Sequence, residues 1–112
     1  MARGSRTTVS LDMARIPLIE GARGLAAQGL ITGASGRNWS AYGHEIHLDG
    51  ALDLVDRHLL TDPQTSGGLL VACAPETVAD VLAVFQRHGF ADAADIGCID
   101  PVTDEGIHLR VR

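Results

Sequence analysis

The chain has 112 residues, of which 46% are hydrophobic and 21% charged, and its formal net charge is -5. These values are typical of one soluble globular domain, here residues 1–112. They give no electrostatic reason to expect nucleic acid or an anionic membrane as a partner. All nine basic residues are arginines, which excludes a Walker-type phosphate lysine and a Schiff-base lysine within this sequence. No apolar run approaches the ~18 residues that span a bilayer, so we expect a cytoplasmic protein.

The first thirty residues predict one strand and one short helix. Residues 7–11 alternate between two sets of side chains, which predicts a strand. Apolar positions within residues 18–26 follow helical spacing, and Gly29 stands where a left-handed residue ends a helix.

Four segments in the middle of the chain continue the pattern. Residues 32–43 are small and polar and predict a structured loop, whereas residues 44–48 alternate and predict a strand. Apolar residues at helical spacing predict a short helix over residues 52–59. Residues 69–73 are apolar throughout, which is typical of a core strand covered on both faces.

The last third of the chain predicts the longest amphipathic helix and a hairpin. Residues 78–85 carry an apolar stripe at helical spacing, and Gly89 fits the end of that helix. Residues 94–99 and 107–111 predict two strands that pair as a hairpin. The whole order of elements predicts an α+β domain, with helices packed on a mixed sheet.

The cysteines and histidines do not predict a metal or thiol site. Cys73 and Cys98 lie on predicted core strands, where a reduced, buried cysteine packs like a small apolar residue. His44 and His47 lie three positions apart on a predicted strand and therefore point to opposite faces. We expect no catalytic and no metal-binding residue in this chain.

The turn over residues 62–68 is the segment best suited to bind a ligand. Thr65 and Ser66 offer hydroxyl groups, and Gly67 and Gly68 can expose consecutive backbone amides that hold phosphate oxygens without a lysine. Asp62 can help to place a magnesium ion through water, or it can cap its own turn. From the residues alone, anion binding and a purely architectural turn both remain open.

A second candidate lies in the predicted loop upstream. Arg37 and Asn38 place a fork-shaped donor next to an amide, and such a pair can hold an anion. The alternative is a surface arginine followed by an asparagine that closes a turn.

The sequence over residues 62–70, DPQTSGGLL, resembles the signature of selenophosphate synthetase (selenide, water dikinase) in its C-terminal domain. The resemblance extends over nearly the whole chain. Its further matching segments are Pro17-Leu18, Gly29-Leu30, Gly36-Arg37-Asn38, Tyr42-Gly43 and residues 94–97. It implies a three-layer α/β/α unit of the aminoimidazole ribonucleotide synthetase-like superfamily. It also implies that Thr65, Ser66, Gly67, Gly68, Arg37 and Asn38 contact nucleotide phosphates.

The resemblance further implies an enzyme that uses ATP and magnesium to convert selenide and water into selenophosphate, AMP and phosphate. In that family the reactive cysteine or selenocysteine, its partner lysine and most metal-binding aspartates lie in an N-terminal domain. A DVTGFG-like segment of the family is also absent here. We therefore expect an inactive C-terminal fragment that needs no cofactor alone and whose partner is its own N-terminal domain. The full enzyme is expected to be a homodimer, and the fragment a monomer.

Two other functions stay open on the sequence. One is a stand-alone module that binds an anionic metabolite through the Gly-Gly turn, since many regulatory domains use a similar α+β scaffold. The other is a dimerisation domain that binds no ligand.

Overall fold

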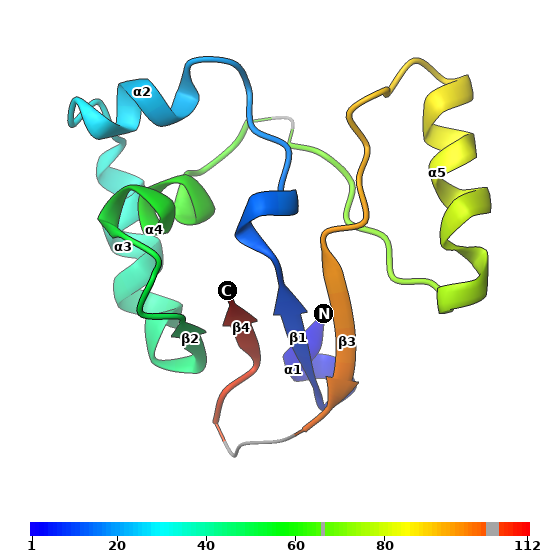
Figure 1. Cartoon of the computed structure of the whole chain (residues 1–112). Helices are drawn as coiled ribbons and strands as arrows, with labels where there is room; N and C mark the ends of the chain where they lie inside the picture. Colours follow the sequence, from blue (N-terminus) through cyan, green and yellow to red (C-terminus); the bar gives the residue numbers. More distant parts are fainter. Residues whose placement is uncertain (66, 103–105) are drawn as a thin grey trace.

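The computed structural model describes residues 1–65, 67–102 and 106–112, and it contains a four-stranded mixed sheet flanked by helices (Figure 1). The strands are β1 (Thr7–Leu11), β2 (Ile46–Leu48), β3 (Gly97–Pro101) and β4 (Leu109–Val111). The helices are α1 (Ala2–Ser5), α2 (Ala22–Ala27), α3 (Gly33–Tyr42), α4 (Leu54–Thr61) and α5 (Val78–Arg87). Short 3-10 turns occupy Met13–Arg15, Gly43–Glu45 and Pro75–Thr77. The predicted α+β class is confirmed.

Strand β1 lies inside the sheet, whose order is β2-β4-β1-β3. It pairs antiparallel with β3 and parallel with β4, and β4 pairs parallel with β2. The predicted hairpin between residues 94–99 and 107–111 is therefore wrong, because β1 separates the two strands. Alternation identifies a strand and its faces, but it carries no information about which neighbour accepts its hydrogen bonds.

The two faces of the sheet differ in chemistry. Val9 is in register with Ile99 on one side and Leu109 on the other, so these apolar side chains share one face. Thr8 and Ser10 point to the opposite face, which is polar. Val111 and Met13 are the buried hydrophobic residues of the described ranges, at 1% and 6% exposure, so the apolar core is small.

Gly97 allows β3 to approach β1 more closely than any other residue could. A Cβ atom at this position would overlap the carbonyl oxygen of Ser10 and would lie 3.0 Å from the Cα of Leu11. Both obstacles are backbone atoms of a paired strand, which cannot move aside independently. The pairing of β1 with β3 therefore requires glycine at position 97.

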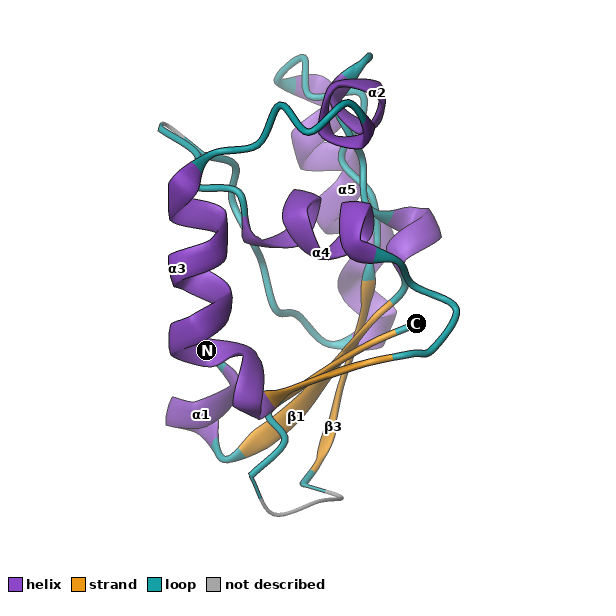
Figure 2. Cartoon of the chain, turned by 90° about the vertical axis from the view of Figure 1, so that its left-hand side faces the viewer, coloured by secondary structure: helices purple, strands orange, loops and turns teal. Residues whose placement is uncertain are grey.

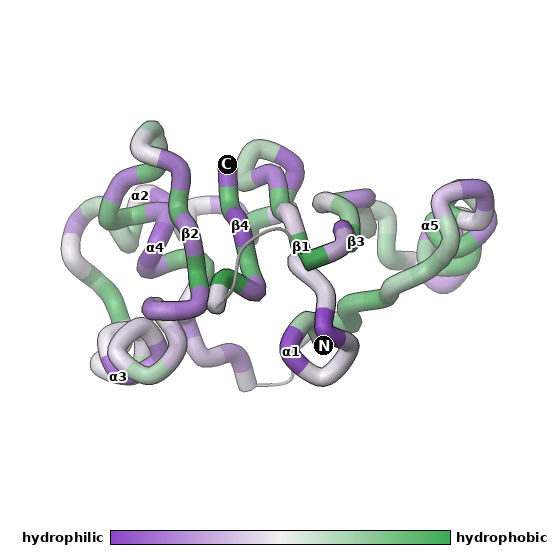
Figure 3. The backbone as a smooth tube through the Cα atoms, turned by 90° about the horizontal axis from the view of Figure 1, so that it is seen from below, coloured by the Kyte–Doolittle hydropathy of each residue, from purple (hydrophilic) through white to green (hydrophobic). Residues whose placement is uncertain are grey.

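Apart from α1, which packs on β1, the helices form two groups at opposite edges of the sheet. Helices α2 and α3 pack against α4 beside β2, whereas α5 stands beyond β3 (Figures 1 and 3). Figure 2 shows α3 nearly upright, with α4 crossing it at a steep angle. No helix of the described ranges is long and apolar enough to cross a membrane.

Residues 32–43 were predicted to form a loop, but residues 33–42 form helix α3. The Thr32 side chain caps the helix by accepting a hydrogen bond from the backbone amide of Ser35, at 3.3 Å. Gly33 and Gly36 lower the stability of this helix by about 1 kcal/mol each relative to alanine. A contact with α4 offsets this loss of stability. The Arg57 guanidinium of α4 lies 5.0 Å from the centroid of the half-buried Trp39 ring, at cation–π distance. Capping and packing on α4 thus outweigh the low helix propensity.

The predicted core strand over residues 69–73 is also wrong. The segment lies outside all strands of the described chain, and Leu69 and Leu70 are 82% and 60% exposed. An apolar run indicates that burial is favourable, but a strand forms only where a neighbouring strand supplies hydrogen bonds. Cys73 on this segment and Cys98 on β3 are accordingly exposed, not buried as predicted.

The predicted strand over residues 7–11 and the predicted helices over 52–59 and 78–85 are confirmed as β1, α4 and α5. Gly29 and Gly89 both have positive φ after the helices they follow, as expected. The Phe90 ring folds back on Phe85 with 6.2 Å between centroids. Residues 44–48 split into a 3-10 turn and the shorter strand β2.

Candidate functional site

A network of buried hydroxyl groups joins α3 to α4. Ser35 is 1% exposed, and its Oγ lies 2.6 Å from Thr61 Oγ1 and 3.2 Å from His58 Nδ1. The Thr61 hydroxyl donates to the carbonyl oxygen of Arg57 at 2.8 Å, so it accepts from Ser35. Ser35 and His58 thus form part of a hydrogen-bond network that joins the two helices.

Two further hydrogen bonds fix the point where the 62–68 segment leaves α4. Asn38 Nδ2 donates to the carbonyl oxygen of Thr61 at 2.9 Å. The Thr32 hydroxyl, which also caps α3, donates to Asp62 Oδ1 at 3.2 Å. The beginning of the segment is therefore tied to α3 at two points, the cap residue Thr32 and Asn38 in the middle of the helix.

Arg37 lies in the middle of α3. Its side chain is exposed, and a Cβ atom built on Gly33 would lie 3.5 Å from Arg37 Nη1. The guanidinium group therefore folds back over the first turn of the helix, where the helix dipole is positive. The guanidinium group and the positive end of the helix dipole therefore lie at the end of α3 where Thr32 holds Asp62.

The segment itself is exposed where the structure describes it. Thr65, Gly67 and Gly68 are all open to solvent, and Ser66 lies outside the described residues. Gly67 approaches the side chain of Gln64, since an added Cβ would lie 3.4 Å from Gln64 Cβ, whereas nothing surrounds Gly68. A contact of this length is ordinary van der Waals packing, so a larger side chain would fit at either position.

Helix α2 is tied to the same unit through Asp56. This residue is 7% exposed, forms an ion pair with Arg23, and closes a capping box with Asp53. Burial alone would raise the pKa of Asp56. The hydrogen bonds from the Asp53 amide and from Arg23 outweigh burial and hold that pKa below its usual value.

The sequence analysis missed Ser35, Thr61 and Asp56. The D-x-x-D spacing of Asp53 and Asp56 before an apolar run was a readable capping signal. The hydroxyl network had no such signal, because it joins residues of two helices, one of which was not predicted.

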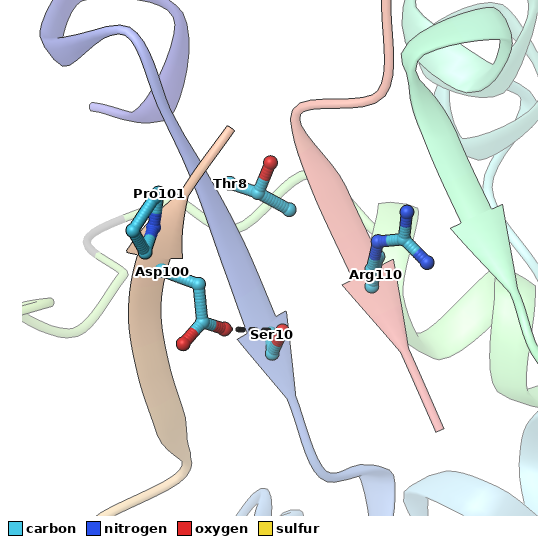
Figure 4. A pocket seen from close by; sticks show the side chains of 5 residues that line it. All are labelled: Thr8, Ser10, Asp100, Pro101 and Arg110. Carbon is cyan, nitrogen blue, oxygen red and sulfur yellow. Dashed lines mark hydrogen bonds between the residues drawn. The ribbon is translucent and has the colours of Figure 1, made fainter. Parts of the chain in front are cut away.

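A separate shallow hollow of about 460 Å³ lies on the polar face of the sheet (Figure 4). Its lining residues are Thr8, Ser10, Asp100, Pro101 and Arg110. The Ser10 hydroxyl donates to Asp100 Oδ2 at 2.9 Å, and the Thr8 hydroxyl donates to the Ile107 carbonyl at 3.3 Å. Its hydroxyl groups are thus already engaged, and none of the predicted site residues lines it.

The Cys98 thiol lies beside a carboxylate. Desolvation and the neighbouring carboxylate of Asp100 raise its pKa, which disfavours the thiolate form. Its Sγ donates to Asp100 Oδ2 at 3.4 Å. Across residues 1–65, 67–102 and 106–112, no three His, Cys, Asp or Glu side chains gather as a metal site would require.

The fold and the tied 62–68 segment belong to a known class of domain. The family described as AIR synthase related protein, C-terminal domain, matches residues 1–110, and the chain belongs to this family.

Within this family the chain is most instructively compared with proteins named selenide, water dikinase. The one from Burkholderia pseudomallei is 56% identical over 97 residues, which cover 87% of this chain and 27% of the relative. The one from Paraburkholderia xenovorans is 52% identical over 106 residues, covering 95% of this chain and 29% of the relative. The one from Pseudomonas straminea is 50% identical over 97 residues, with coverages of 87% and 27%. The predicted resemblance is confirmed, and the chain spans little more than a quarter of these relatives.

Proposed function

We propose that this chain is the C-terminal domain of a cytoplasmic, homodimeric enzyme that converts selenide, ATP and water into selenophosphate, AMP and phosphate. The observation that carries the proposal is the 56% identity to a selenide, water dikinase over 97 residues. In this enzyme the domain binds nucleotide phosphates, and the phosphoryl transfer itself takes place on an N-terminal domain.

The geometry beside α3 supports phosphate binding. Thr65, Ser66 and the amides of Gly67 and Gly68 contact phosphate oxygens in this proposal, and the exposed Arg37 guanidinium supplies positive charge. Asn38 contributes to the same site by holding the end of α4, through its hydrogen bond to the Thr61 carbonyl. The side chains need no lysine for this role.

Magnesium has no matching set of ligands in the described part of this chain. We therefore assign the ion's ligands to the N-terminal domain, where the ion would neutralise phosphate charge. The isolated chain also lacks lysine, and we propose that it is catalytically inactive and monomeric, with the N-terminal domain as its partner.

An amide NMR titration with magnesium–ADP and with pyrophosphate tests the phosphate contact. We expect saturable shifts at Thr65, Gly67 and Gly68, and loss of these shifts in Arg37→Gln. Arg87→Gln is the matched control, because Arg87 is an exposed arginine on the distant α5. Equal shifts in both variants would remove Arg37 from the site. No shift at millimolar ligand would contradict phosphate binding by this chain.

A further inference from the structure

The hydroxyl network between α3 and α4 donates its hydrogen bonds in one direction. The Thr61 hydroxyl group has one proton, which it donates to the Arg57 carbonyl oxygen at 2.8 Å. The proton in the 2.6 Å contact between Thr61 Oγ1 and Ser35 Oγ therefore comes from Ser35. If Ser35 donated instead to the His58 carbonyl oxygen at 3.4 Å, two hydroxyl oxygens would face each other at 2.6 Å with no proton between them.

This direction assigns the tautomer of His58. Because the Ser35 proton points to Thr61, Ser35 Oγ accepts in its 3.2 Å contact with His58 Nδ1. Nδ1 must then carry a proton, and in the neutral imidazole Nε2 is left without one. Free histidine in water favours the opposite tautomer. The chain of hydrogen bonds from His58 through Ser35 and Thr61 to Arg57 therefore stabilises a form that solvent alone would not favour.

The chain of hydrogen bonds ends at the residue from which the 62–68 segment leaves α4. Thr61 is the last residue of the helix and directly precedes Asp62. Its side chain is held by Ser35, and its carbonyl oxygen accepts a hydrogen bond from Asn38 Nδ2 at 2.9 Å. Ser35 is 1% exposed, so water cannot replace its partners. The orientation of Thr61, and with it the direction in which the segment leaves the helix, depends on the whole chain of hydrogen bonds.

We propose that His58 is a positioning residue for the 62–68 segment. Its Nδ1–H group orients Ser35, and Ser35 orients Thr61 at the start of the segment. The inference rests on the proposed function, and it names the residue that keeps the phosphate-binding segment in place without touching the ligand. The alternative is a histidine that only complements the negative end of the α4 dipole from the last turn of the helix, a role that requires charge and not a proton on Nδ1.

Nitrogen NMR of the imidazole rings tests the tautomer. At about pH 8.5, where imidazole is neutral, long-range 1H–15N correlations distinguish the protonated ring nitrogen from the unprotonated one. We expect His58 mainly in the Nδ1–H form, and His88, which is exposed after α5, mainly in the Nε2–H form. Ser35→Ala should raise the Nε2–H share of His58 and leave His88 unchanged. A His58 ring that matches His88 in the native chain would overturn the proposal.

Two amide substitutions at position 58 test the positioning role. The side-chain nitrogen of asparagine can take the place of Nδ1, whereas the nitrogen of glutamine reaches further, to the place of Nε2. Asparagine is the poorer helix former of the two, so an effect through the stability of α4 alone would make His58→Gln the milder change. Positioning through Nδ1 makes His58→Asn the milder change. The two roles therefore predict opposite orders for the same pair of variants.

The readout is the order of the segment, measured by 1H–15N heteronuclear NOE values of Gln64, Thr65, Gly67 and Gly68. We expect these values to stay at the native level in His58→Asn and to fall in His58→Gln. Pyrophosphate should bind His58→Gln about fivefold more weakly than the native chain, the factor that corresponds to one typical hydrogen bond. Its affinity for His58→Asn should be unchanged. Equal effects of the two substitutions, or a larger effect of His58→Asn, would overturn the proposal.

The outcome is separable from that of the nucleotide titration. An Nδ1–H tautomer and a segment that loses order only in His58→Gln, without any shift on addition of pyrophosphate, would keep His58 as a positioning residue and would remove the phosphate contact. Equal binding of pyrophosphate by both variants, with His58 in the Nε2–H form, would do the reverse.

Discussion

The α3–α4 junction and the stretch from residue 69 to α5 lie on opposite sides of one sheet, and they distribute their side chains in opposite ways. The junction buries a serine and an aspartate, and satisfies both with hydrogen bonds. The stretch beside β3 leaves leucine and valine side chains in water. The first region satisfies its buried polar groups within the described residues, whereas the second leaves apolar side chains exposed.

This difference shows that hydrophobicity and burial are separate properties of a segment. Buried polar groups persist at the junction because each has a partner, and removing one partner leaves the other unsatisfied. Exposed leucines persist beside β3 although each would gain from burial. Substitutions should therefore be costly in the sheet and at the junction, and nearly neutral on the β3 side of the isolated chain.

The largest loss is expected for Gly97→Ala, at the strand pair that separates the two regions. The new methyl group would overlap the Ser10 carbonyl, so β3 would have to move away from β1. We expect a loss of about 3 kcal/mol or more in the free energy of unfolding. Urea denaturation followed by circular dichroism measures it. Gly68→Ala is the control, because nothing surrounds position 68, and an equal loss there would contradict the account.

Ser35→Ala tests whether the junction depends on its hydroxyl network. The change removes the hydrogen bond that Thr61 Oγ1 accepts from Ser35 and the contact of Ser35 with His58 Nδ1. We expect a loss of about 1–3 kcal/mol in the free energy of unfolding. Ser40→Ala on the exposed part of α3, where Oγ contacts the Gly36 carbonyl, serves as the matched substitution. If Ser35→Ala and Ser40→Ala had the same free energy of unfolding, the network would not stabilise the junction.

The smallest effect is a dependence of stability on acid. The pKa of Asp56 is lowered in the folded chain, so its contribution is present above the unfolded pKa of about 4 and is lost as pH falls through the folded pKa. We expect the melting temperature to drop below pH ~4 by more in the native chain than in Asp56→Asn. Arg23→Gln should reduce this drop in part, since Arg23 forms the ion pair. Identical profiles for the native chain and Asp56→Asn would refute the assignment.

Hydrophobic periodicity within short windows correctly predicted three elements of the fold. The apolar stripe of α5, the spacing in α4 and the alternation in β1 are properties of short windows, and all three elements are present. Helix α3 was missed because its stability comes from the Thr32 cap and from Arg57 on another helix. The hairpin was wrong because pairing with β1 is decided by residues ninety positions away.

The sequence predicted individual residues of the candidate site but not the contacts that bring their segments together. Arg37 and Asn38 were selected by residue type and by resemblance; the structure ties Asn38 to the end of α4 and folds Arg37 toward Gly33, and their role in binding stays a prediction. The hydrogen bond from Thr32 to Asp62 that brings these parts together joins residues thirty positions apart. Such a contact leaves no trace in composition or spacing.

The inner position of β1 has a consequence for the order in which the chain acquires structure during synthesis. Thr7 is in register with Pro101 and Leu11 with Val111, so β1 has no strand to pair with until residues 97–111 have left the ribosome. Helices α3 and α4 are close in sequence and can associate before that point. The nascent chain would therefore carry an unpaired β1 beside a formed helical pair while residues 62–96 are being made.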